Sequence, residues 1–100
     1  MTDTGVVDEI DHHRFAYEED GRLAQLVYQA EPGRLVLVHT EVPEELGGRG
    51  IAGRLVQAAV ERAAASGETI APWCPYARKW LSDHKEAAHT VAIDWRARPS

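Results

Sequence analysis

The stretch from Glu41 to Arg54, EVPEELGGRGIAGR, has the residue types of an anion-binding turn. Gly47, Gly48 and Gly50 lie between a β-branched run and a segment with helical periodicity. Glycine allows positive φ and close approach of the backbone to a ligand, and the free amides of a helix N-terminus favour negative charge. We therefore expect the amides of residues 49–52 to hold a phosphate or pyrophosphate. A tight strand-to-helix connection without a ligand is the alternative.

A second candidate is Cys74, in the sequence PWCPYARKWL. Pro75 suits the first position of a helix, which places Cys74 at or near its N-cap. The positive end of the helix dipole can lower the pKa of a thiol there, so that Cys74 could act as a nucleophile, an acid or a base. A buried cysteine that only packs is the alternative.

His39 and Glu41 form the third candidate, because residues two apart on a strand share a face. Either side chain could accept a proton from a substrate, directly or through a water molecule. A hydrogen-bonded structural histidine beside a solvated glutamate is the alternative. We expect no metal site, because the remaining histidines lack ligand spacing with supporting carboxylates or thiols; they are His12, His13, His84 and His89.

The elements that must position these residues are strands followed by a helix. Alternating or β-branched residues predict strands over residues 12–18, 22–30 and 35–41, joined by turns at 19–21 and 31–33. This order predicts an antiparallel meander of three strands.

Beyond the glycine turn, apolar residues recur with helical spacing over residues 50–66, and Gly67 supplies a C-terminal cap. A short strand at 68–72 would then return parallel to the third strand through a right-handed crossover. A helix from Pro75 and a short extended piece at 91–95 complete an α+β unit. We expect one domain over residues 1–100, with residues 1–10 and 96–100 frayed.

Composition narrows the classes of function. The chain has 100 residues and a net charge of −5, without a basic stripe, which disfavours nucleic acid and favours a cationic partner such as an amine. One cysteine allows no internal disulfide, and from the residue pattern we expect neither a signal peptide nor a membrane-spanning run. We expect a cytoplasmic protein without a membrane partner, and a monomer.

Two stretches, LVHTEVPEELGGRGIAGRLV and APWCPYARKWL, resemble the small single-domain members of the GNAT (N-acetyltransferase) superfamily, sometimes called YjdJ-type acetyltransferases. The resemblance covers residues 12–88 and implies a minimal GNAT fold that binds acetyl-CoA. Its pyrophosphate loop has the form Gln/Arg-x-x-Gly-x-Gly/Ala, which Gly50 and Ala52 match. Gly47 occupies the first position instead of glutamine or arginine, so that a side-chain contact to phosphate is either lost or supplied by Arg49.

The resemblance also implies a function: acetyl transfer from acetyl-CoA to an amine on a small molecule or protein. The pantetheine arm would lie where the strands at 35–41 and 68–72 diverge, with Cys74, His39 and Glu41 nearest the chemistry. Tyr76 is the alternative acid for the departing thiolate, or else a half-buried core aromatic. A CoA-binding protein without catalysis, and a phosphate-binding domain unrelated to CoA, are the competing hypotheses. The residues expected to contact the cofactor are Val38, His39, Thr40, Gly47, Gly48, Arg49, Gly50, Ile51, Ala52 and Gly53.

Overall fold

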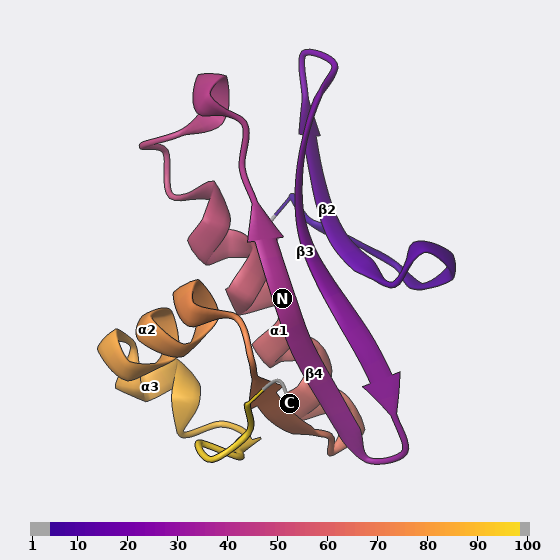
Figure 1. Ribbon diagram of the computed structural model, residues 1–100, viewed down its shortest axis with the longest axis vertical. Coiled ribbons are helices and arrows are strands. Elements are labelled where there is room, and N and C mark those ends of the chain that lie inside the picture. The colour runs from indigo at the N-terminus through magenta and orange to yellow at the C-terminus, as the bar shows by residue number, and fades with distance from the viewer. Residues whose placement is uncertain (1–4, 99–100) are drawn as a thin grey trace.

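The computed structural model describes residues 5–98, which form a mixed sheet with helices packed on one of its faces (Figure 1). The sheet has the order β1-β2-β3-β4-β5-β6. Its strands are β1 (Val7–Glu9), β2 (Arg14–Glu19), β3 (Arg22–Glu31), β4 (Arg34–Glu41), β5 (Thr69–Pro72) and β6 (Ala92–Ile93). The helices are α1 (Ile51–Ser66), α2 (Pro75–Asp83) and α3 (Lys85–Ala88), with short 3-10 turns at η1 (Ile10–His12) and η2 (Glu44–Leu46).

The predicted meander and crossover are confirmed. Strands β2, β3 and β4 pair antiparallel, and β4 pairs parallel with β5 after the chain crosses through α1. Asp20 and Gly21 both have positive φ and make the tight turn between β2 and β3, as a two-residue hairpin requires. Gly67 caps α1 in the left-handed conformation, and its N–H donates to the carbonyl of Ala63 at 2.8 Å.

The sequence predicts a sheet of four strands, but within residues 5–98 the sheet has six. The prediction is wrong because one further strand lies at each edge of the sheet. Residues 7–9, which we expected to be frayed, form β1 and pair antiparallel with β2. At the other end, the short extended piece expected at 91–95 contains β6, which joins the sheet as a sixth strand parallel to β5. The expected loose tail after residue 95 is also held, since Arg78 donates to the carbonyls of Trp95 and Ala97 at 2.7 and 2.6 Å. Residues 1–4 and 99–100 lie outside the described part of the chain.

The main core lies between the sheet and the helices. One stripe of α1 is buried because its apolar residues recur every three or four positions: Ile51, Leu55, Val56, Ala59, Val60 and Ala63. These residues pack on the strand side chains that point the same way, among them Phe15, Leu26 and Leu37. No helix in residues 5–98 is long and apolar enough to cross a membrane.

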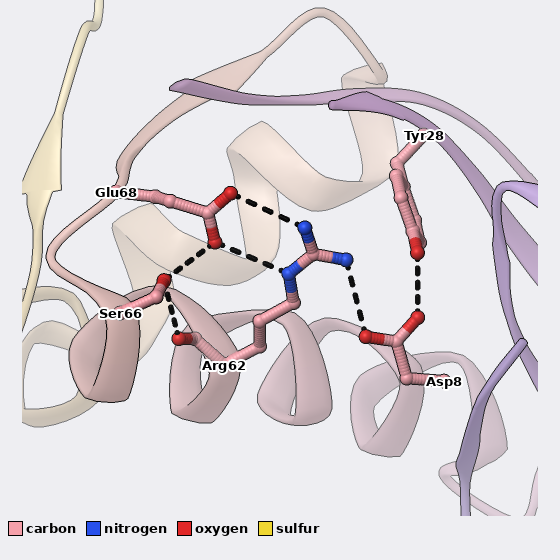
Figure 2. A network of polar contacts seen from close by, with 5 residues as sticks. All are labelled: Asp8, Tyr28, Arg62, Ser66 and Glu68. Atoms are coloured by element: carbon pink, nitrogen blue, oxygen red, sulfur yellow. Dashed lines mark hydrogen bonds and ion pairs between the residues drawn. The ribbon is translucent and has the colours of Figure 1, made fainter. Parts of the chain in front are cut away.

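A polar cluster fastens β1 to the C-terminal half of α1 (Figure 2). Figure 2 shows the guanidinium of Arg62 between two carboxylates, with Nη1 donating to Asp8 and Nε donating to Glu68, each at 3.1 Å. The Arg62 guanidinium also lies 4.9 Å from the ring centroid of Tyr28, whose hydroxyl donates to Asp8 at 2.6 Å. Burial and the hydrogen bond to Asp8 raise the pKa of Tyr28 to about 12. The cluster thus joins segments more than 50 residues apart in sequence.

Candidate functional site

The glycine turn takes the conformation that an anion cradle requires. Gly48 and Gly50 both have φ of +75°, and Gly50 is the N-cap of α1. The first helical hydrogen bond runs from the N–H of Arg54 to the carbonyl of Gly50, so the preceding amides of α1 have no acceptor within the helix. A Cβ built on Gly48 or Gly50 meets no atom within 4 Å. The turn therefore offers free amides next to open space.

Arg49 is engaged on the protein itself. Its guanidinium donates twice to Glu19 at the end of β2, with Nη2 lying 2.9 Å from Oε1. Hydrogen bonds from Arg49 and Tyr17 lower the pKa of Glu19 to about 2. The ion pair ties the glycine turn to the β2–β3 hairpin, so a contact from Arg49 to a phosphate would require its release from Glu19.

Strand β4 changes its pairing at Val38. The register with β3 passes from Leu37 opposite Tyr28 to His39 opposite Val27, which leaves Val38 as the extra residue of a β-bulge. On its other edge, β4 pairs with β5 only as far as Leu37. Among the strand pairs of residues 5–98, the edge of β4 from Val38 to Glu41 has no β5 partner. The predicted opening between the two strands would lie along this unpaired edge.

Cys74, the N-cap of α2, lies at the point where β4 and β5 separate. Its N–H donates to the carbonyl of Leu37 at 2.8 Å, and its Sγ lies 3.2 Å from Oγ1 of Thr40. Cys74 as a whole is 3% exposed and belongs to the main core. The cysteine is therefore placed beside the opening, but a substrate can reach its sulfur only if this contact opens.

Tyr76 follows in the first turn of α2 and is exposed at the surface. Burial of the hydroxyl, with a smaller contribution from Cys74, raises the pKa of Tyr76 above its usual value. A phenol is protonated at neutral pH, so Tyr76 has a proton to donate.

His39 and Glu41 lie on the face of the sheet away from the helices. Their side chains meet, with Nε2 of His39 2.8 Å from Oε1 of Glu41, and each is more than half exposed. Gln25, directly opposite Glu41 on β3, donates to Oε2 of the same carboxylate at 3.0 Å. Hydrogen bonds from Gln25 and His39 lower the pKa of Glu41.

The structure therefore divides the predicted catalytic residues between two faces of β4. Thr40 is opposite the core residue Leu26 and contacts Cys74 on the helix side, whereas His39 and Glu41 point to the other side. Sequence reasoning missed Gln25. Its only signal is its position on the expected 22–30 strand, and the bulge at Val38 decides which residue of β4 it opposes.

The described residues contain no group of three or more His, Cys, Asp or Glu side chains that could hold a metal ion.

The helix that carries the glycine turn is positioned by a close contact with α2. A Cβ on Gly53, in the first turn of α1, would lie 2.7 Å from Nε1 of Trp80. Trp80 in turn stacks on His84, with ring centroids 4.0 Å apart. Gly53 is thus required by packing, in addition to any role in ligand binding.

We expect Gly53→Ala to lower the free energy of unfolding by about 1–3 kcal/mol, because the added methyl overpacks the contact with Trp80. In a protein that already carries Trp80→Ala, Gly53→Ala should raise the free energy of unfolding by up to about 1 kcal/mol, since alanine forms helix better than glycine. Urea unfolding of the four proteins of this cycle measures both values. An equal effect of Gly53→Ala on the two backgrounds would contradict the proposed packing role.

Comparison with known families agrees with this geometry. The model of the GCN5-related N-acetyl-transferase family matches residues 14–91, a span that contains β2 to α3 together with the glycine turn and Cys74. A comparison with curated proteins finds no significant match. On the family match, this chain belongs to the GCN5-related N-acetyltransferases, the GNAT superfamily.

Proposed function

We propose that this protein is an acetyl-CoA-dependent N-acetyltransferase that acts on an amine acceptor. The family match indicates acyltransferase activity. One structural observation supports acetyl-CoA as the donor: a glycine turn with free helix-start amides follows strand β4, whose edge has no β5 partner after Leu37. A diphosphate fits the first feature, and an extended chain with amide groups fits the second.

The residues present fit this ligand in charge and in space. The amides of Ile51, Ala52 and Gly53 would hold the pyrophosphate, beside the open space at Gly48 and Gly50. The unpaired backbone of residues 38–41 would bind the pantetheine amides as an added strand does. When bound, acetyl-CoA would supply the acetyl group as a thioester.

Side chains on the two sides of β4 are assigned the two proton transfers that amide formation needs. The exposed pair of His39 and Glu41 can take the proton that the attacking amine loses. The phenol of Tyr76 can give a proton to the sulfur as the carbon–sulfur bond breaks, because a phenol is protonated at neutral pH. Backbone N–H groups near the bulge at Val38 are the candidate donors to the developing negative charge on oxygen.

We propose direct transfer to the amine rather than an acetylated cysteine. The support is the burial of Cys74, whose sulfur contacts Thr40 in the core. Reactive cysteines are usually accessible, whereas buried ones are inert. In this proposal Cys74 closes the inner end of the opening and caps α2.

Calorimetric titration with acetyl-CoA, CoA and ADP tests the proposal, together with an amine-acceptor screen that detects released CoA. We expect both CoA ligands to bind more tightly than ADP, CoA release only with an amine present, and no added acetyl mass on Cys74. Binding without turnover of any amine would favour the non-catalytic CoA binder. Equal affinity for ADP and CoA would favour a general phosphate-binding domain, and an acetyl mass on Cys74 would replace direct transfer by the covalent route.

A further inference from the structure

A chain of side-chain hydrogen bonds crosses the sheet from β1 to β4 on the face away from the helices. Nε of Arg14 donates to Glu9 at 2.6 Å, and Nη1 of Arg14 donates to Oε1 of Gln25 at 3.2 Å. Nε2 of Gln25 donates to Glu41 at 3.0 Å, and the other oxygen of Glu41 meets Nε2 of His39 at 2.8 Å. The chain therefore ends on the histidine beside the opening of β4.

Each side chain in this chain determines which atoms of the next side chain donate a hydrogen bond and which accept one. A guanidinium can only donate, so the amide oxygen of Gln25 must face Arg14 and its NH₂ group must face Glu41. An ionised carboxylate can only accept, and the lowered pKa of Glu41 keeps it ionised at neutral pH. The ring nitrogen that faces Glu41 must consequently carry a hydrogen.

We infer that this chain fixes the neutral imidazole of His39 as the Nε2–H tautomer, which leaves the free lone pair on Nδ1. Gln25 is thus a positioning residue that acts on His39 through Glu41. The further consequence, that Nδ1 is the atom that takes the proton from the amine, rests on the proposed function. The tautomer itself does not, because it follows from the hydrogen bonds alone.

Substituting Glu41→Gln reverses the expected tautomer. The NH₂ group of Gln25 still requires an acceptor, so it holds the amide oxygen of the new side chain on its own side. The amide NH₂ of the new side chain then faces His39 and needs a ring nitrogen with a lone pair. We expect His39 to change from Nε2–H in the native protein to Nδ1–H in this variant.

Two-bond ¹H–¹⁵N correlation spectra of the histidine rings, recorded above the pH range in which they titrate, distinguish the tautomers directly. The signals of His39 are assigned by their loss in His39→Gln. In the double variant Gln25→Leu/Glu41→Gln, the side chain at position 41 is free to turn, and we expect shifts averaged between the two tautomers. The matched control is Gln29→Leu/Glu41→Gln, because Gln29 is exposed on the same face of β3; it should keep the Nδ1–H form.

The proposal is overturned if Glu41→Gln keeps the Nε2–H form, or if Gln25→Leu/Glu41→Gln gives the same spectrum as Glu41→Gln alone. Backbone ¹H–¹⁵N spectra that superimpose with the native spectrum away from β3 and β4 establish that each variant is folded. The tautomer is read without substrate, so an absence of transferase activity would refute the proposed function and leave this result intact. In an active enzyme, Glu41→Gln should lower kcat at least tenfold while CoA affinity stays within twofold.

Discussion

Replacing Gly50 by glutamate is expected to weaken CoA binding by about 100-fold, a change of about 2.7 kcal/mol in binding free energy. The new carboxylate would project from the N-cap of α1 into the open space beside the free amides, where it repels a phosphate. Because Gly50 has a φ of +75°, the substitution should also cost about 1–2 kcal/mol of stability. Calorimetric titration with CoA, together with urea unfolding, separates the two effects.

Gly33→Glu is the matched control for this prediction. Gly33 has a φ of +72° and also faces open space, but it lies in the turn that begins β4, at the opposite end of that strand from the glycine loop. The control should lose similar stability and retain native CoA affinity. A folded Gly50→Glu protein that binds CoA within threefold of the native affinity would exclude this turn as the pyrophosphate site.

Replacing Arg62 by methionine is expected to lower the free energy of unfolding by about 2 kcal/mol, which corresponds to a fall of roughly 10 °C in Tm. The change removes the cation between Asp8 and Glu68, so that both carboxylates lose an ion-pair partner. Their side chains are 27% and 12% exposed, respectively. Methionine keeps much of the apolar stem, so the loss reports mainly on the charge and its hydrogen bonds. Thermal unfolding of the native protein and of Arg62→Met at neutral pH measures this loss of stability.

The pH dependence of this loss is also predicted. Burial opposes ionisation of Glu68, but the hydrogen bonds from Ser66 and Arg62 prevail and lower its pKa below 4.5. When a carboxyl group has a lower pKa in the folded than in the unfolded protein, it stabilises the fold at pH values above its unfolded pKa. This stabilisation is lost as the pH falls through its pKa in the folded protein. The difference in free energy of unfolding between the native protein and Arg62→Met should therefore become smaller below about pH 4.5.

Lys79→Met serves as the control for Arg62→Met, because Lys79 pairs with Asp83 at 2.9 Å on an exposed helix surface. Pairs of this kind contribute little, and the control should change stability by less than about 0.5 kcal/mol. If Arg62→Met changes the free energy of unfolding as little as Lys79→Met does, then the cluster in Figure 2 does not hold β1 on α1.

Features that arise from local periodicity and from special backbone residues could be predicted before the fold was known. Strands β2 to β5, helix α1 and the parallel crossover follow from alternation, helical spacing and Gly67. The N-cap position of Cys74 follows from Pro75, because proline suits the first helical turn. The family assignment also followed from local sequence, since the glycine turn and the cysteine motif each lie within one continuous stretch.

Which residues face one another depends on contacts between segments that are distant in the sequence. Strand β1 has three residues and is recognisable only by its pairing with β2, since it is too short for a periodic signal. The bulge at Val38 sets the partner of every later residue of β4, and it thereby places Gln25 against Glu41. Long-range contacts of this kind depend on register, bulges and packing between distant segments, which no local pattern encodes. For the same reason, the division of His39 and Cys74 between the two faces of the sheet becomes visible only in the folded protein.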